Sequence, residues 1–307
     1  MANLEANFLD LHLKNPLVLA SGILGTSPSL MERCALEGAG AITSKSCGPE
    51  PRAGHDNPVA LAWDWGVINA IGLTNPGADE EVPLLSKTKE RLSALGVPLF
   101  ASIFAPTLAD FGKVAKVIAE AEPDLIEVNI SCPNVANEFG TPFSASASSA
   151  AAVTRVVRRA VDIPISIKLA PNVPDIAGIA HAAAEEGADA ITAVNTMPAM
   201  LVDPPAGKPV LKNRTGGLSG PALKPIALRC VAEIAQRVSL PIIGTGGISN
   251  GLDAAEMLMV GASLVGIGSA IWRDGPSAFR RIADELKAFM DQEGYGRLED
   301  LRGRAIR

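Results

Sequence analysis

The sequence predicts an α/β fold of the (β/α)8 or TIM barrel type. Three observations lead to this prediction: eight short apolar runs, helix-like segments between them, and a suitable length and composition. The chain of 307 residues is 48% hydrophobic but only 4% aromatic, which is typical of buried parallel strands covered by Ala-rich helices. Its length fits one barrel of about 250 residues with insertions. We therefore expect residues 1–307 to form a single domain.

The apolar runs predict the strands of the barrel. They are residues 17–22, 41–46, 98–103, 125–131, 164–169, 190–196, 241–246 and 264–269. Apolar residues spaced by three and four predict helices between them, at 107–121, 146–160, 175–186, 223–237 and 251–260. Because strands that alternate with helices pair in parallel, eight of them indicate a closed barrel.

Three segments fall outside this repeat. Residues 3–13 alternate apolar and polar side chains, which favours an N-terminal β-hairpin that closes the bottom of the barrel. Residues 47–80 and 197–218 are long, Pro- and Gly-rich segments that follow the second and sixth strands. Long loops in a compact domain usually carry function, and loops after strands lie at the C-terminal face, where barrel enzymes bind substrates.

Composition argues against several classes of function. The net charge is −6 without a basic stripe, so nucleic acid is not an expected partner. The sequence contains no signal peptide and no apolar stretch of about 18 residues, so no membrane contact is expected. The cysteines do not form a C-x-x-C pair, so we expect no zinc or iron–sulfur site in this chain. Four scattered cysteines suggest a reducing compartment, which predicts a cytoplasmic protein.

Glycines at the ends of the last two predicted strands indicate a phosphate site. Gly246 and Gly247 follow the seventh strand, and Gly268 and Ser269 follow the eighth. Glycine lets backbone N–H groups approach an anion closely, and these two loops are the usual phosphate site of the fold. Tight turns alone would also explain one such pair, but two adjacent pairs favour a flavin mononucleotide or a phosphorylated substrate.

One cysteine stands out as a candidate for chemistry. Cys132 follows the fourth strand between Ser131 and Pro133, and the proline favours an exposed, non-helical turn. Cys34 and Cys230 lie in helical patterns, where we expect buried and inert thiols. Cys47, just past the second strand, is a weaker second candidate.

Two lysines and four asparagines complete the candidate site. Lys45 and Lys168 lie at the ends of apolar strands, and since lysine is rarely buried alone, we expect both to face an anion in the barrel mouth. The alternative is a lysine that reaches solvent at the strand end. A cation beside the N1–C2=O edge of a flavin would stabilise its reduced ring. Asparagine suits a ring of amide donors and acceptors, and four are placed near strand ends or in the long loop after the second strand: Asn69, Asn129, Asn134 and Asn195.

Several segments together resemble one family. They include INAIGLTNPG at 68–77, IEVNISCPN at 126–134, TGGLSGPALKPIAL at 215–228 and IIGTGGISNGLDAAEMLMVGAS at 242–263. The chain resembles the class 1 dihydroorotate dehydrogenases over essentially its whole length, and most of all the NAD-linked, two-subunit branch called class 1B. The segments NISCPN and GGLSGPALKP are the specific part of this resemblance.

The resemblance implies a role for each matching residue. Cys132 would be the general base that removes the C5 proton of dihydroorotate, while hydride passes from C6 to FMN. The residues implied to hold the pyrimidine and its carboxylate are Lys45, Asn69, Ala70, Ile71, Gly72, Leu73, Asn129, Asn134, Asn195 and Thr196. The residues implied to hold FMN are Ser21, Lys45, Ser46, Asn129, Lys168, Val194, Gly220, Gly246, Gly247, Gly268 and Ser269.

The resemblance also implies partners. In the NAD-linked branch a separate subunit with FAD and a [2Fe–2S] cluster delivers electrons to NAD, and this chain lacks the cysteines for such a cluster. A homodimer, or a heterotetramer with two partner subunits, is the implied assembly. The implied reaction is the oxidation of dihydroorotate to orotate in pyrimidine synthesis.

The sequence departs from the family pattern in three places. The stretch after SCPN reads VANEFGTPFSASASSA, the loop after Thr196 reads MPAMLVDPPAG, and Ser102 stands where the family usually has an asparagine that faces the flavin. Three other readings stay open at this point. They are a dihydropyrimidine dehydrogenase-like FMN enzyme, a flavoprotein that only relays electrons, and a barrel aldolase or isomerase with Lys168 as a Schiff base.

Overall fold

The structure is a computed structural model that describes residues 2–131 and 143–307. Eight parallel strands form a closed barrel, and each pairs with the next along the chain until the last pairs with the first. These strands are β3 (Leu17–Leu19), β4 (Ala41–Thr43), β7 (Leu99–Ile103), β8 (Leu125–Asn129), β9 (Ile165–Leu169), β10 (Ala190–Ala193), β15 (Ile242–Thr245) and β16 (Leu264–Ile267). The predicted barrel is confirmed, and each predicted strand contains one of these strands.

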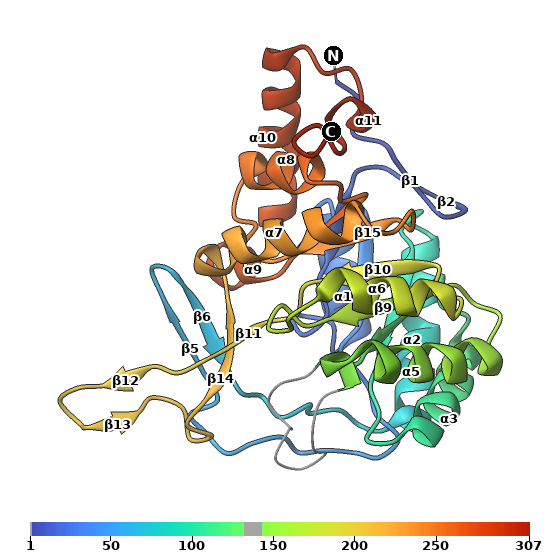
Figure 1. Ribbon diagram of the computed structural model, residues 1–307, viewed down its shortest axis with the longest axis vertical. Coiled ribbons are helices and arrows are strands. Elements are labelled where there is room, and N and C mark those ends of the chain that lie inside the picture. Colours follow the sequence, from blue (N-terminus) through green and yellow to red (C-terminus); the bar gives the residue numbers. More distant parts are fainter. Residues whose placement is uncertain (1, 132–142) are drawn as a thin grey trace.

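Helices surround the barrel (Figure 1). They are α1 (Pro28–Leu36), α2 (Ala78–Ser93), α3 (Leu108–Ile118), α5 (Ala147–Ala160), α6 (Ile176–Glu185), α7 (Lys224–Ala235), α8 (Gly251–Met259), α9 (Ser269–Asp274), α10 (Ala278–Glu293) and α11 (Leu298–Leu301), with 3-10 turns η1 (Ala119–Ala121), η3 (Phe143–Ala145) and η4 (Pro221–Leu223). The five predicted helices are α3, α5, α6, α7 and α8. Helices α1, α2, α9, α10 and α11 were not among the predicted helices. Helix α2 begins inside the Pro- and Gly-rich segment and contains Pro83.

Side-chain caps explain where many of these helices begin. The side chains of Ser27, Thr107, Ser146, Asp175 and Asn250 each accept a hydrogen bond from a backbone N–H of the following first turn. Such a bond satisfies one of the N–H groups that a helix start leaves without a partner. The caps therefore fix the starts of α1, α3, α5, α6 and α8, which follow five of the barrel strands.

An antiparallel hairpin closes the bottom of the barrel, as the sequence predicted. Strands β1 (Ala6–Phe8) and β2 (Leu11–Leu13) pair with Phe8 opposite Leu11. The ring of Phe8 is fully buried and lies 6.1 Å from the ring of Phe100 in β7. Aromatic burial at this end completes the hydrophobic core below the site.

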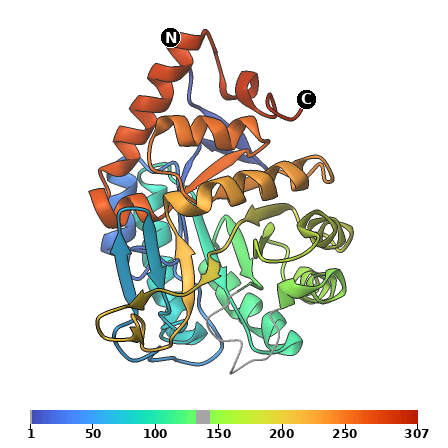
Figure 2. The ribbon, with the colours of Figure 1, turned by 60° about the vertical axis from the view of Figure 1, so that its left-hand side comes forward.

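The two long segments that the sequence predicted as loops contain β-strands. They contain β5 (Ala60–Trp63), β6 (Gly66–Asn69), β11 (Met197–Ala199) and β14 (Gly216–Ser219), which form a four-stranded antiparallel sheet in the order β11-β14-β6-β5. A further hairpin, β12 (Val202–Asp203) with β13 (Lys208–Pro209), extends from it. Figures 1 and 2 show this small sheet standing out from the barrel. It has its own small core of Ile68, Ala70 and Leu211.

Glu81 is a buried carboxyl group in the first turns of α2. Glu81 is only 5% exposed. Burial raises its pKa to about 7, and the charge of the nearby Lys45 has a smaller, opposite effect on this pKa. A raised pKa means that the folded chain favours the protonated acid. The raised pKa therefore contributes to the stability of the fold in full below about pH 4.5, the ordinary pKa of a glutamate. This contribution is lost as the pH rises through about 7, the pKa of Glu81 in the fold.

Replacing Glu81 by glutamine should therefore stabilise the protein at high pH. We expect Glu81→Gln to match the wild type in melting temperature near pH 5 and to exceed it by roughly a few degrees at pH 8. Thermal unfolding followed by circular dichroism over this pH range measures the difference. Glu80→Gln, on the exposed neighbouring position, is the control and should show no such trend. A Glu81→Gln curve parallel to the wild type would show that Glu81 is already ionised in the fold.

Candidate active site

A pocket opens at the C-terminal face of the barrel, where we expected the site. Every predicted site residue that the structure describes lines it except Ala70, which is buried in the small sheet's own core. The lining residues predicted from the sequence are Ser21, Lys45, Ser46, Asn69, Ile71, Gly72, Leu73, Asn129, Lys168, Val194, Asn195, Thr196, Gly220, Gly246, Gly247, Gly268 and Ser269. Two further predicted residues, the candidate base Cys132 and Asn134, lie outside the described residues.

The glycine turns form one end of this pocket. Gly246 and Gly247 follow β15 with φ angles of +135° and +79°. Residues other than glycine rarely adopt such backbone conformations. A Cβ atom on Gly247 would lie 2.6–2.8 Å from Lys224, so the turn packs too closely for any larger residue. Gly268, after β16, has open space instead, because a Cβ there would meet only Ala20 at 3.8 Å. Both turns thus present bare backbone to the pocket.

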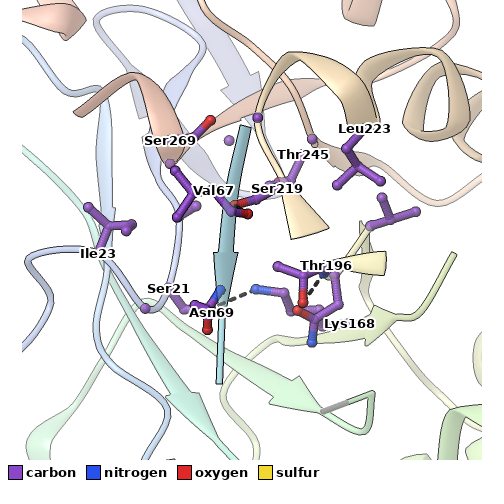
Figure 3. Close-up of a pocket in the computed structure, with 18 of the residues that line it drawn as sticks. Ser21, Ile23, Val67, Asn69, Lys168, Thr196, Ser219, Leu223, Thr245 and Ser269 are labelled. Atoms are coloured by element: carbon purple, nitrogen blue, oxygen red, sulfur yellow. Dashed lines mark hydrogen bonds between the residues drawn. The ribbon is translucent and has the colours of Figure 1, made fainter. Parts of the chain in front are cut away.

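Lys168 lies at the opposite end of the pocket (Figure 3), on β9. Its Nζ donates to Ser21 Oγ at 2.7 Å and to Glu127 Oε1 at 3.3 Å. The Lys168 and Glu127 side chains are only 6% and 4% exposed. The alternative of a lysine that escapes to solvent is therefore wrong for Lys168.

Asparagine side chains form a connected group beside Lys168. Asn195 Nδ2 donates to Asn129 Oδ1 at 3.2 Å and to Ser131 Oγ at 2.9 Å. Asn129 Nδ2 donates to Ser46 Oγ at 3.2 Å, which links the group to the segment that follows β4. As predicted, the two asparagines lie at or just past strand ends: Asn129 ends β8, and Asn195 lies two residues beyond β10. Their amides are oriented by one another, so they present fixed donors and acceptors to a polar ring.

The roof of the pocket comes from the small sheet. Val67 and Asn69 on β6, Ser219 on β14 and Gly220 line it. Asn69 belongs to a strand rather than to a loop, contrary to the prediction, and its Nδ2 donates to Gly217 O at 3.4 Å. The roof was not foreseen because its strands come from segments far apart in the sequence.

Asn75 fixes the loop that follows β6. Its Oδ1 accepts hydrogen bonds from Gly48 N at 3.2 Å and Gly77 N at 2.9 Å, and its Nδ2 donates to Leu73 O at 2.8 Å. The same Oδ1 accepts a bond from the Cys47 thiol at 3.4 Å. These bonds hold the loop residues 71–73 against the pocket, in the place where the resemblance put a substrate loop.

The remaining described cysteines have structural surroundings. Cys34 in α1 and Cys230 in α7 are fully buried, and burial raises the pKa of Cys34 to about 11 and also raises that of Cys230. Cys47 is 1% exposed and does not line the pocket. Burial, with a smaller effect from Glu81, raises the pKa of the Cys47 thiol to about 12. Because the thiolate is the basic form, these surroundings do not favour Cys47 as a base.

Sequence reasoning missed several residues of this site. Glu127 is the most important, and its signal was a charge inside the apolar strand LIEVN, on the same face as Asn129. Leu223 and Trp272 add apolar surface to the pocket, and Trp272 follows the Gly268 turn by one helical turn.

The described residues contain neither a candidate metal-binding cluster nor a membrane-spanning helix. No group of three or more His, Cys, Asp or Glu side chains in residues 2–131 and 143–307 is placed to hold a metal ion. Within the same residues, every helix is too short or too polar to cross a membrane.

The chain is similar in sequence, over nearly its whole length, to known proteins of one description. Residues 3–290 match the family model described as "Dihydroorotate dehydrogenase". A Methanosarcina mazei protein is 43% identical over 96% of this chain and 93% of its own length, and one from Methanocaldococcus jannaschii is 41% identical over 98% of both. A Pyrococcus abyssi protein is 39% identical over 99% of both chains. All three are named "Dihydroorotate dehydrogenase B (NAD(+)), catalytic subunit". With this match over nearly its full length, the chain belongs to the dihydroorotate dehydrogenase family.

Proposed function

We propose that this chain is the catalytic subunit of an FMN-dependent dihydroorotate dehydrogenase that oxidises dihydroorotate to orotate. The observation that carries the proposal is the arrangement of the pocket. Glycine turns lie at one end, and a buried lysine and a group of oriented amides lie at the other. A phosphorylated cofactor with a polar ring fits such a pocket, and the names of the relatives supply the substrate.

The residues of the pocket fit FMN. The backbone at Gly246, Gly247, Gly268 and Ser269 would hold its phosphate, since bare N–H groups bind anions, and Gly268 leaves room for one. Lys168 would lie against the flavin ring, where its charge favours the anionic reduced form. When bound, FMN supplies the acceptor for the hydride from C6 of the substrate.

The substrate residues act by orientation and by removal of a proton. Asn129 and Asn195, already held by each other, would bind the amide groups of the pyrimidine, together with Asn69 from the roof. Lys45 would bind the carboxylate from the pocket wall. Cys132 would take the C5 proton, and Asn134 would bind the substrate from the same segment.

The proposal is tested by adding L-dihydroorotate to the FMN-loaded chain without oxygen and following the flavin absorbance. We expect prompt bleaching in the wild type and a rate lower by about 10²–10⁴-fold in Cys132→Ser near neutral pH, because serine is a far weaker base. Cys47→Ser is the matched control and should bleach at nearly the wild-type rate. A slow Cys47→Ser with a fast Cys132→Ser would move the base to Cys47. A yellow wild type that stays oxidised would remove dihydroorotate as the substrate.

The phosphate site is tested by a matched pair of glycine variants. Gly247→Ala should lose most of its FMN, because the new Cβ would displace the turn from Lys224. Gly96→Ala is the control, since Gly96 also has a positive φ, +63°, but has no atom within 4 Å of the added Cβ. Fluorescence titration of each apoprotein with FMN measures the affinity. Equal affinities in the two variants would show that the Gly247 turn does not hold the cofactor.

The electrons pass on, in this proposal, through a partner subunit with FAD and a [2Fe–2S] cluster to NAD. The names of the relatives support a second subunit, because each is called a catalytic subunit. A homodimer of this chain, bound to two such partners, is the assembly that we propose.

This route predicts that the isolated chain cannot use NAD. With dihydroorotate, we expect the FMN-loaded chain to reduce an artificial dye but to leave NAD unchanged. Addition of the partner subunit should start NADH formation, which is followed at its own absorbance. The dye reaction controls for an active preparation. NADH formation by the isolated chain would show that no partner is needed.

A further inference from the structure

Glu127 is a charged residue that the proposed reaction leaves without a role. It lies in the middle of β8 and is 3% exposed. Its Oε1 accepts bonds from Ser102 Oγ at 3.0 Å and from Lys168 Nζ at 3.3 Å. A carboxylate in such a place is retained only when it is paired. Its pairing with a lysine of the pocket wall suggests a function beyond the core.

The pair belongs to a chain of polar contacts across the barrel. Ser102 Oγ shares a hydrogen bond of 2.8 Å with Ser46 Oγ, which in turn accepts a bond from Asn129. At the other end Lys168 donates to Ser21. The contacts therefore run from the segment that follows β3 to the end of β8, and they connect the lysine end of the pocket with the amide group.

These contacts determine where the ammonium group of Lys168 lies. Lysine has a long flexible stem and three donors, and Ser21 and Glu127 account for two of the three. With two donors directed at fixed oxygens, the ammonium group is held at the wall of the pocket. A ligand in the pocket therefore meets a cation in a fixed position.

Glu127 also changes the charge that a ligand meets. Ion pairs this far from water interact much more strongly than exposed ones. A ligand next to Lys168 thus experiences a cation and, just behind it, an anion. Without the anion the same lysine would stabilise negative charge in the pocket more strongly.

We propose that Glu127 is a positioning residue that fixes Lys168 Nζ at the pocket wall and, by offsetting its charge, keeps the midpoint potential of bound FMN low. This inference rests on the proposed function, because it takes FMN as the ligand. The reduced flavin ring carries the negative charge, so Glu127 weakens the binding of reduced FMN more than that of oxidised FMN. By linkage, that difference in affinity is a shift in potential.

The test compares the midpoint potentials and FMN affinities of the wild type and Glu127→Gln. The amide keeps the size of the side chain and an oxygen for Lys168 but removes the charge. We expect the affinity of Glu127→Gln for oxidised FMN to stay within a few-fold of the wild-type value. Its affinity for reduced FMN should exceed the wild-type value by at least about tenfold. For a two-electron couple, a tenfold gain in affinity for reduced FMN raises the midpoint potential by about 30 mV.

Two further variants separate charge from structure. Ser166→Ala removes a buried hydroxyl on β9 that forms a hydrogen bond with Thr192 and, among the described residues, with neither Glu127 nor Lys168. It should keep the wild-type potential. Glu127→Asp retains the charge but withdraws it from Lys168 by one methylene, so it should shift the potential in the same direction by less. Glu127→Asp also serves if Glu127→Gln does not fold.

The outcomes distinguish this inference from the proposed function. A wild-type chain that fails to bind FMN overturns both. If the wild type binds FMN and the Glu127 variants bind it with an unchanged or more negative potential, the role of Glu127 is overturned while the proposed function stands. An equal shift in Ser166→Ala would mean that loss of packing, and not of charge, moves the potential.

Discussion

The pairing of β16 with β3 is the constraint on which the rest of the structure depends. It sets Gly266 opposite Val18 and closes eight parallel strands into a barrel. Because all the strands run in one direction, their carboxyl ends meet at one face. Ser21, Lys168 and Gly268 come from the beginning, middle and end of the sequence, yet they line one pocket. An open sheet of the same strands would leave the first and last of these residues at opposite edges.

Closure also decides what the inside of the barrel can contain. Side chains on each strand alternate between the barrel interior and the helices. In β9, Ile165 and Ile167 are buried with the apolar core, while Lys168 reaches Glu127 and Ser166 reaches Thr192. A charge in the interior has little water around it, so its partner has to come from another strand. The buried cation of the site thus requires an anion on β8, and the two strands are paired side by side.

The sequence allowed the barrel and most of the pocket to be predicted, because both follow from local patterns. A buried strand is an apolar run, and its carboxyl end shows which residues reach the mouth. The small sheet escaped prediction because β6 pairs with β14 across nearly half of the chain, and such pairing leaves no local period. Asn69 was therefore placed in a loop. Glu127 escaped for a related reason: its charge was visible, but its partner Lys168 lies on another strand.

The pocket therefore has two walls with different origins. The barrel supplies the floor, in which charges and amides hold one another across several strands. The small sheet supplies the roof, whose core of Ile68, Ala70 and Leu211 is separate from the main core. Changes in the roof can thus alter what lies over the substrate without disturbing the buried ion pair. Floor residues lack that freedom, because each one satisfies a buried polar neighbour, and loss of one leaves another without a partner. For this reason we expect the floor residues, on which the chemistry depends, to stay the same. Substrate preference is expected to vary with the residues of the roof.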